Sequence, residues 1–322
     1  MTEFVITAQN RPAQHDQAVY FCVDAKFHPF ALFVANQIAT KYPERQFDLC
    51  LISAVPLPDH PLIAEHDIRV LQIDASAWGA KLPADERISF AAYLRIMAPQ
   101  LLAQDYRRML YLDADIFYQR GDLNRLLALD LQGRAVGAVR DMIQLRKEDR
   151  VPGDFVPFKL PFAKYFNSGV LLIDTQAWNA QQITERSLSF AAENAAKLLA
   201  HDQTALNVTL RDNWAELSLV WNYEYSHQTM YFAGMFDVCL FHFIGRRKPF
   251  NQRYGGFPRR FTEEYRRFFQ TWMPDMPNPA QNGLDVRNHR RAHFYALVFH
   301  IVNYGRFLPN DDRFLSHWDV LL

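Results

Sequence analysis

The sequence has 322 residues, of which 49% are hydrophobic and 22% charged, and these are the fractions of an ordinary globular protein. They exclude a wholly disordered chain, a collagen and a coiled coil. The 35 basic and 35 acidic side chains give a formal net charge of zero, which argues against a nucleic-acid binder held by overall charge.

The cysteines are few and scattered, at Cys22, Cys50 and Cys239. This spacing fits neither a disulfide framework nor a structural zinc site, so a reducing compartment is favoured. The first residues lack the cationic and apolar stretches of a secretory signal, and no run approaches the roughly 20 apolar residues that cross a bilayer. We therefore expect a cytoplasmic protein, either free or peripheral on the inner membrane face.

Apolar runs and helical periods alternate along the chain after a polar segment of residues 1–17. Short apolar runs predict strands at residues 18–23, 47–53, 69–73, 108–112, 136–139 and 170–173. Helical spacing predicts helices at residues 30–42, 88–98, 122–129 and 181–199, and another from Asp202; Pro43 and Pro99 are expected to end the first two. Alternation of this kind is typical of an α/β fold with a central, mostly parallel sheet flanked by helices.

The sequence beyond about His242 is locally basic and aromatic. Eight of its side chains crowd into one predicted helix: Arg259, Arg260, Phe261, Tyr265, Arg266, Arg267, Phe268 and Phe269. Two interpretations are open. The helix could lie on an anionic membrane leaflet, or it could pack its aromatic side chains on the main domain and leave the arginines in solvent.

The sharpest chemical feature is the pair Asp113 and Asp115, which follows the predicted strand 108–112 directly. Ligands of open α/β sheets bind outside the carboxyl ends of strands, and alternation would place both aspartates on one face of a continuing strand. Two carboxylates this close need a cation, and Mg²⁺ or Mn²⁺ bridging a diphosphate is the candidate. Taken alone, the pair fits a polar loop with capping aspartates equally well.

Six segments give that pair a context, in this order along the chain: the strand that ends at Asp24, then Ser89–Ile96, Tyr111–Tyr118, Phe166–Trp178, His201–Asn207 and His242–Phe250. Together they resemble the retaining glycosyltransferases of family 8, galactosyl- and glucosyltransferases that use a nucleotide sugar. The resemblance implies a GT-A-type nucleotide-sugar-binding fold. It divides the chain into a tail (1–17), a catalytic domain (18–250) and a basic, aromatic helical appendage (251–322) for acceptor or membrane association.

The resemblance also implies a metal centre. Asp113, Asp115 and His242 would hold Mn²⁺, with Mg²⁺ as the alternative, because an imidazole shifts the preference of carboxylates toward Mn²⁺. Lys248 would meet the departing diphosphate. Without the resemblance, His242 would be interpreted as an ordinary core or surface histidine and Lys248 as a solvated side chain.

The donor site implied by the resemblance consists of Asp24, Arg95, Asp141, Asn167 and Gly245, with Asp202 beside the donor sugar. Three of these residues have ordinary structural explanations as well: a helix-surface salt bridge for Arg95, turn chemistry for Asn167 and a helix N-cap for Asp202. Lys26 stands where the family often has Asn, so the choice of nucleotide stays open.

Gln203 would lie, by the same resemblance, on the face of the sugar opposite the diphosphate. A two-step retaining mechanism needs a carboxylate nucleophile there, and an amide is a poor one. We therefore favour a same-face path through an oxocarbenium-like sugar. In it the β-phosphate takes the proton of the attacking hydroxyl and the carbonyl oxygen of Gln203 stabilises the positive charge.

The expected function is that of a metal-dependent retaining hexosyltransferase, with Gln203, Asp202 and Lys248 as catalytic residues. It would move galactose or glucose from a UDP-sugar to a glycan or glycolipid hydroxyl, as in lipopolysaccharide biosynthesis, and bind no nucleic acid. Two alternatives remain from the sequence. One is a catalytically silent nucleotide-sugar-binding protein of the same fold, and the other is a metal-dependent nucleotidyltransferase or phosphohydrolase.

Overall fold

The structure is a computed structural model, and it describes residues 4–79, 81–83, 90–146, 149–226, 228–250, 257–277, 286–311 and 313–322. The expected helix start at residues 88–89 and the expected domain boundary at residue 251 lie outside these residues.

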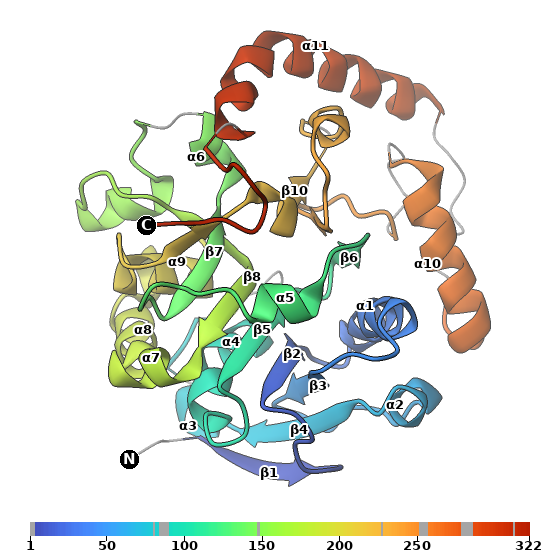
Figure 1. Cartoon of the computed structure of the whole chain (residues 1–322), viewed down its shortest axis with the longest axis vertical. Coiled ribbons are helices and arrows are strands. Elements are labelled where there is room, and N and C mark those ends of the chain that lie inside the picture. The colour runs from blue at the N-terminus through green and yellow to red at the C-terminus, as the bar shows by residue number, and fades with distance from the viewer. Residues whose placement is uncertain are drawn as a thin grey trace.

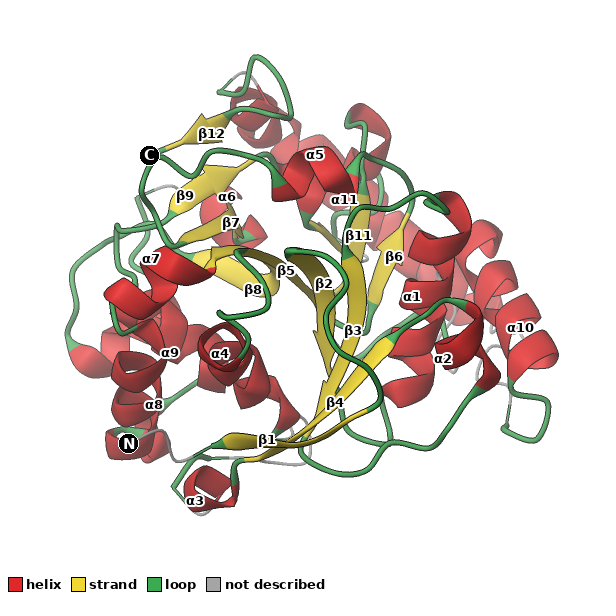
Figure 2. Cartoon of the chain, turned by 60° about the horizontal axis from the view of Figure 1, so that its bottom comes forward, coloured by secondary structure: helices red, strands yellow, loops and turns green. Residues whose placement is uncertain are grey.

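Nine strands of the described residues form one sheet in the order β1-β4-β3-β2-β5-β8-β7-β9-β12 (Figure 1; β9 and β12 are labelled in Figure 2). Six strands, β4, β3, β2, β5, β7 and β9, run in one direction and the other three run against them, so the expected mostly parallel sheet is confirmed. The nine strands are β1 (Val5–Gln9), β2 (Gln17–Cys22), β3 (Asp48–Ser53), β4 (Arg69–Asp74), β5 (Arg108–Leu112), β7 (Val136–Arg140), β8 (Phe166–Asp174), β9 (Ala215–Leu217) and β12 (Val320–Leu321). A three-stranded sheet beside it holds β10 (Tyr223–Tyr225), β11 (Leu240–Phe243) and β6 (Ile116–Tyr118).

Helices cover both faces of the large sheet, as Figure 2 shows: α4, α7, α8 and α9 on one face, and α1 and α2 on the other, with α10 beyond α1. The α-helices are α1 (His28–Lys41), α2 (Pro61–Glu65), α3 (Ser76–Gly79), α4 (Ala91–Leu101), α5 (Leu123–Leu127), α6 (Met142–Arg146), α7 (Thr175–Ala180), α8 (Ile183–Glu193), α9 (His201–Thr209), α10 (Arg259–Trp272) and α11 (Val286–Asp311). Short 3₁₀ turns lie at Gly153–Phe158 (η1), Ala195–Lys197 (η2), Leu219–Trp221 (η3) and Phe232–Met235 (η4).

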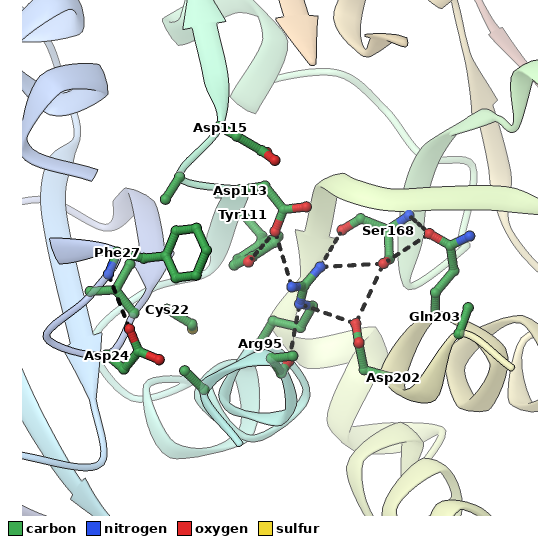
Figure 3. A pocket seen from close by; sticks show the side chains of 15 residues that line it. Cys22, Asp24, Phe27, Arg95, Tyr111, Asp113, Asp115, Ser168, Asp202 and Gln203 are labelled. Atoms are coloured by element: carbon green, nitrogen blue, oxygen red, sulfur yellow. Dashed lines mark hydrogen bonds and ion pairs between the residues drawn. The ribbon is translucent and has the colours of Figure 1, made fainter. Parts of the chain in front are cut away.

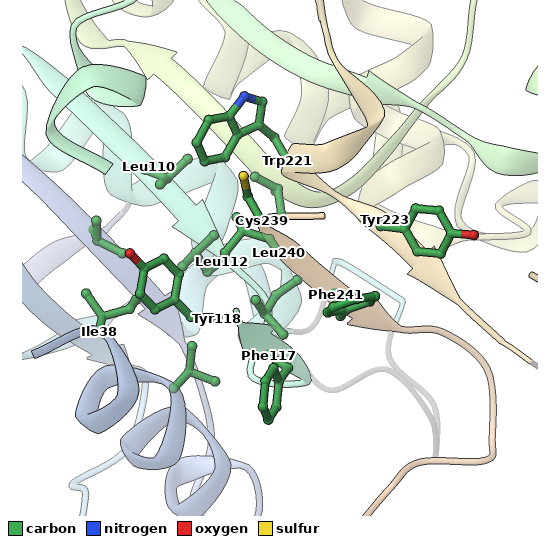
Figure 4. Packing of buried hydrophobic residues seen from close by; sticks show 14 of the residues in the cluster. Ile38, Leu110, Leu112, Phe117, Tyr118, Trp221, Tyr223, Cys239, Leu240 and Phe241 are labelled. Carbon is green, nitrogen blue, oxygen red and sulfur yellow. The ribbon is translucent and has the colours of Figure 1, made fainter. Parts of the chain in front are cut away.

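The central strands are buried on both sides, which explains their continuous apolar sequence. In β2, Val19 and Phe21 pack into the core under α1, whereas Ala18 and Tyr20 pack into the core under α4. The first of these cores continues through β5, β6 and β11 (Figure 4). Helices therefore close both cores of the sheet.

Three local expectations are wrong. Pro99 does not end its helix, because the carbonyl of Arg95, whose helical partner would be the N–H that proline lacks, accepts a hydrogen bond from the Tyr20 hydroxyl at 3.1 Å. The long helix predicted at 181–199 is α8 and η2, separated at Asn194. Part of the expected polar tail forms β1, which pairs with β4 at the sheet edge.

The aromatic side chains of α10 pack against the main domain. Phe261, Tyr265, Phe268 and Phe269 are all buried, and the Tyr265 ring stacks on Phe33 of α1 at 3.9 Å between centroids. The spacing of the four rings places them on one helical face. The packing interpretation of this helix is therefore confirmed, and the interpretation that these rings enter a membrane leaflet is wrong. Among the described residues, no helix combines the length and the apolar character that crossing a bilayer requires.

Candidate active site

Asp113 and Asp115 lie in a turn between the two sheets. β5 ends at Leu112 and β6 begins at Ile116, so the expectation of a continuing strand with both aspartates on one face is wrong. The turn is fixed by the Asp113 N–H, which donates to the Gly169 carbonyl at 2.9 Å, and by the Ile116 N–H, which donates to the Asp113 carbonyl. Because β6 pairs with β11 in a register that sets Ile116 opposite His242, the turn carries both carboxylates to that imidazole.

The three side chains converge. One ligand atom each of Asp113, Asp115 and His242 lies within 4.8 Å of the other two. Nε2 of His242 lies 3.5 Å from Oδ2 of Asp113 and 3.2 Å from Oδ1 of Asp115. Oδ1 of Asp115 is buried and accepts no hydrogen bond from the described residues. A buried carboxylate oxygen of this kind, facing a second carboxylate and an imidazole, fits a divalent cation.

Lys248 joins the same cluster. Its Nζ lies 2.5 Å from Oδ2 of Asp115 and also contacts the carbonyl oxygen of Phe243. Burial raises the pKa of Asp115, but the ammonium of Lys248 and the imidazole of His242 together outweigh it and hold the pKa well below its usual range. Asp115 is therefore ionised at any neutral pH, and the predicted diphosphate-binding lysine stands beside the predicted metal ligands.

Arg95 of α4 connects the aspartates of two distant segments (Figure 3). Its guanidinium lies 3.0 Å from Oδ1 of Asp113 and 3.2 Å from Oδ2 of Asp202, and it donates to the Ser168 carbonyl at 3.1 Å. The group stacks over the Tyr111 ring at 4.4 Å. Arg95 is only 8% exposed, so the interpretation as a helix-surface salt bridge is wrong. Its contact with a donor stays a prediction.

Asp202 and Gln203 lie in the first turn of α9 and face the same space (Figure 3). Ala200, not Asp202, is the N-cap residue of this helix, so the capping interpretation of Asp202 is wrong. Burial raises the pKa of Asp202 more than Arg95 lowers it. The carbonyl oxygen of Gln203 accepts from the backbone N–H of Ser168 at 2.9 Å and from its hydroxyl at 3.2 Å, while the amide nitrogen donates to the Tyr165 hydroxyl.

A cavity of about 290 Å³ lies between these groups. Six of the sequence-predicted residues line it: Asp24, Arg95, Asp113, Asp115, Asp202 and Gln203. Asp24 sits at the end of β2, where its side chain accepts from the N–H groups of Lys26 and Phe27 and fixes the entry to α1. The cavity therefore opens at the carboxyl ends of β2 and β5, as the sheet topology predicts.

The other three predicted donor residues lie apart from this lining. Asn167 is buried behind it, where its Oδ1 accepts from the Gly169 N–H and from Nδ2 of Asn222. Asp141 lines a second cavity of about 330 Å³, which it shares with Gln203. Gly245 is exposed and has a φ of +77°, a left-handed conformation that turns the chain between His242 and Lys248.

Sequence reasoning missed three residues of the site. The Tyr111 hydroxyl donates to Oδ1 of Asp113 at 2.6 Å, Oδ1 of Asn222 lies 3.0 Å from Nδ1 of His242, and Gly169 leaves room for the His242 ring. Tyr111 and Gly169 lie in two of the segments that resemble the family, Tyr111–Tyr118 and Phe166–Trp178. Their positions in these segments could have indicated that they belong to the site. Asn222 lies outside all six segments that resemble the family, so the sequence did not indicate its place in the site.

Comparison with known protein families identifies the family of this chain. The model of the family described as "Glycosyl transferase family 8" matches residues 18–253. The chain belongs to glycosyltransferase family 8. It is therefore a glycosyltransferase, and the predicted family is confirmed.

Relatives and solved structures agree with this family. The chain is 30% identical over 256 residues to general stress protein A of Bacillus subtilis, covering 71% of this chain and 86% of that protein. It is 32% identical over 180 residues to the lipopolysaccharide 1,2-glucosyltransferase of Escherichia coli, covering 53% of this chain and 52%, about half, of that relative. The galactosyltransferase LgtC, solved with donor and acceptor sugar analogues, has a TM-score of 0.65 at 21% identity, with 80% of this chain and 96% of LgtC covered. The likeness to LgtC confirms the GT-A-type fold.

Proposed function

We propose that this family 8 enzyme is a metal-dependent retaining hexosyltransferase that uses a UDP-sugar, with galactose or glucose as the sugar. The observation that carries the proposal is the convergence of Asp113, Asp115 and His242 within 4.8 Å. Asp113 and Asp115 line one cavity together with Asp24, Asp202 and Gln203. Carboxylates at the ends of strands, facing a cavity, are the arrangement that binds a metal-diphosphate group.

Asp113, Asp115 and His242 would hold the cation, and two oxygens with one imidazole nitrogen suit Mn²⁺ better than Mg²⁺. When bound, the ion would supply positive charge to the leaving diphosphate. Lys248, within 2.5 Å of Asp115, would add an ammonium on the same side of the cavity. Asp24 stands at the wall where the uridine is expected, although Lys26 leaves the nucleotide open.

The donor sugar would lie between Arg95, Asp202 and Gln203. Arg95 keeps Asp113 and Asp202 at fixed positions, and this couples the metal ligands to the sugar-binding residues. Oδ1 of Asn167 already accepts from Gly169 and Asn222, so the amide nitrogen of Asn167 is the group that would hydrogen-bond a hydroxyl of the donor sugar. Asp141 would approach the sugar or the acceptor from the second cavity, which Gln203 also borders.

A two-step retaining mechanism needs a carboxylate nucleophile where Gln203 lines the cavity. The amide in its place supports the same-face path. The bonds from Ser168 and to Tyr165 hold the Gln203 amide at the cavity wall. The anomeric bond to the diphosphate would break, the acceptor oxygen would bond to the same face of the sugar, and its proton would pass to the diphosphate. Gln203 would contribute its amide dipole, and not a covalent bond.

The acceptor we propose is a glycan or glycolipid hydroxyl of the cell envelope, which the name of the E. coli relative supports.

A second observation concerns the surface on which the enzyme would meet such an acceptor. Helix α11 buries Ala292, Ala296 and Asn303 on one face. Most of the large apolar side chains described in this helix are exposed instead, namely Phe294, Tyr295, Leu297, Val298, Ile301, Val302 and Tyr304.

This exposed stripe is larger than the scattered apolar side chains of an ordinary surface. The sequence of α11 carries four arginines and one aspartate, so its charge complements an anionic leaflet. We propose that α11, and not α10, makes a peripheral contact at the inner membrane face of a cytoplasmic enzyme. This contact would bring the cavity to a lipid-linked acceptor.

Sedimentation with vesicles that contain phosphatidylglycerol tests the contact. The protein should pellet with them at low salt, less so at high salt, and Ile301→Glu with Val302→Glu should abolish pelleting. Leu315→Glu is the matched control, because Leu315 is 98% exposed and lies outside α11. A dimer that forms through α11 without vesicles, or no pelleting at low salt, would overturn the membrane contact.

Slow release of free hexose from UDP-galactose or UDP-glucose, measured with and without Mn²⁺, tests the enzyme function. Release that requires Mn²⁺ and is lost in Asp115→Asn supports the transferase. A thermal shift with UDP-sugar but no release under any condition would instead favour a silent binding protein. Release of a nucleoside monophosphate with a sugar phosphate would point to phosphohydrolase or nucleotidyltransferase chemistry.

A further inference from the structure

A chain of hydrogen bonds runs behind the metal-binding cluster, from β8 to β11. It begins at the backbone N–H of Gly169, which donates to Oδ1 of Asn167 at 3.0 Å. The same oxygen accepts from Nδ2 of Asn222 at 2.9 Å, and Oδ1 of Asn222 lies 3.0 Å from Nδ1 of His242. Asn222 is 1% exposed and His242 5%, so the chain is closed to bulk water.

The first link fixes the identity of every atom after it. A backbone N–H can only donate, so the side-chain atom of Asn167 that meets it is the carbonyl oxygen. An oxygen can only accept, so the atom of Asn222 that faces Asn167 is its NH₂ group. The remaining atom of Asn222, its carbonyl oxygen, therefore faces His242 and needs a donor.

The orientation of the Asn222 amide determines the tautomer of His242. Oδ1 of Asn222 accepts, so Nδ1 of His242 carries the hydrogen. In a neutral imidazole the other nitrogen then has a lone pair. That nitrogen, Nε2, is the atom 3.2 Å from Asp115 and 3.5 Å from Asp113. Three electron-pair donors thus face one point, which is the arrangement that a cation needs and that a protonated Nε2 would block.

We propose that Asn222 is a positioning residue that fixes His242 in the Nδ1–H tautomer and so keeps Nε2 available as a ligand. This inference rests on the metal-binding role in the proposed function. Groups that orient a metal-ligating histidine through its second nitrogen raise its ligand strength. Asn222 does this from the short segment between η3 and β10, and it lines neither of the two cavities of the site.

The tautomer can be measured directly. Long-range ¹H–¹⁵N correlation on protein labelled at its 11 histidines, with His242 assigned by His242→Gln, distinguishes the two nitrogens at a pH where the ring is neutral. The wild type should show the Nδ1–H form. Asn222→Leu, which keeps the volume but loses the acceptor, should shift His242 to the Nε2–H form or to a mixture. Asn222→Asp, which keeps an acceptor oxygen, should restore the Nδ1–H form.

The second readout is the binding of Mn²⁺ with UDP, followed by electron paramagnetic resonance of the free ion. Loss of such a positioning group weakens metal binding by about 10- to 100-fold, and we expect this for Asn222→Leu. The matched control is Asn207→Ala. Asn207 is a buried asparagine whose amide bonds to the backbone of Phe166 and Gln203 and not to His242, so the tautomer and the Mn²⁺ affinity should stay unchanged.

The two readouts separate this inference from the proposed function. An Nε2–H tautomer in the wild type, or an unchanged tautomer in Asn222→Leu, overturns the positioning role whatever the metal does. A changed tautomer with unchanged Mn²⁺ affinity overturns its link to the metal. If the wild type binds no Mn²⁺ but the tautomers follow the expected pattern, the metal-binding function fails and the positioning role of Asn222 is supported.

Discussion

Gly169 faces the ring of His242 so closely that no side chain fits between them. A Cβ atom built on Gly169 would lie 2.3 Å from Cε1 and 2.6 Å from Nδ1 of His242, and 2.9 Å from Oδ2 of Asp113. Real Cβ atoms do not approach other atoms at such distances. The backbone of β8 therefore forms one wall of the cluster that holds the two aspartates and the imidazole.

We expect Gly169→Ala to separate these ligands. Overpacking of a buried site typically costs about 1–3 kcal/mol of stability, and displacement of the ring should weaken Mn²⁺ binding by about 10-fold or more. Calorimetric titration of Mn²⁺ with UDP and urea unfolding measure the two effects. Gly234→Ala is the control, because nothing lies within 4 Å of its Cβ position. Wild-type Mn²⁺ affinity in Gly169→Ala would contradict the proposed ligand cluster.

A second prediction concerns the guanidinium of Arg95, which is buried between the carboxylates of Asp113 and Asp202. Arg95→Met leaves Asp113 and Asp202 without their shared partner, and breaking such a pair from one side typically costs about 3–5 kcal/mol. Arg95→Lys keeps the charge but cannot form the same forked contacts, so it should lose less stability and still lose activity. Urea unfolding and hexose-transfer rates measure both variants.

The control for this prediction is an exposed arginine. Arg107 pairs with Asp16 where both side chains are more than half exposed, and surface pairs contribute little. Arg107→Met should therefore leave both stability and activity close to those of the wild type. Equal losses of stability in Arg95→Met and Arg107→Met would show that the buried pairs do not hold the site together.

The sequence was most informative where the chemistry is carried by contiguous residues. Asp113 and Asp115 follow a strand, and Asp202 and Gln203 begin a helix, so each pair could be placed from local pattern alone. Their meeting with His242 could be expected only from the family resemblance, since it depends on the pairing of β6 with β11. The α/β class followed from alternating strands and helices.

The features that the sequence did not predict depend on partners far along the chain. Pro99 stays inside α4 because Tyr20, from β2, donates to the carbonyl that proline leaves unpaired. Asn222 gains its role only because Asn167 and His242 lie on either side of it. The packing of α10 was one of two open interpretations, and the contact of Tyr265 with Phe33 decides it. The contacts of Tyr20 and Asn222 have no periodicity or motif of their own, and the helical spacing of the α10 rings does not tell which surface they pack against.

A third prediction concerns acid stability, through a carboxylate distant from the active site. Burial raises the pKa of Asp48, but the Gln14 N–H, the Tyr106 hydroxyl and Arg11 outweigh it, so the pKa lies below its ordinary value. A lowered pKa in the folded state stabilises the protein above the unfolded value of about 3.9, and this stabilisation is lost as pH falls through the folded pKa. The free energy of unfolding should therefore fall steeply below about pH 4.

Substitutions of Asp48 and of its ion-pair partner Arg11 test whether Asp48 causes this loss of stability at low pH. Asp48→Asn should lower the free energy of unfolding at pH 7 and make it depend less on pH below 4, as measured by urea unfolding between pH 3 and 7. Arg11→Gln removes only one of the groups that lower the pKa, so its slope should lie between those of Asp48→Asn and the wild type. A wild-type slope in Asp48→Asn would refute the assignment.

The last prediction tests whether α10 is part of the folded core. The Tyr265 ring stacks on Phe33 at 3.9 Å and contacts Phe250 at 5.1 Å, while its hydroxyl is buried without a hydrogen-bond partner among the described residues. Tyr265→Ala should cost about 3–5 kcal/mol of the free energy of unfolding, as for other buried rings. Tyr265→Phe removes only the unpaired hydroxyl, so it should be neutral or stabilising. Were α10 a separate appendage, neither variant would change the urea midpoint of the main transition.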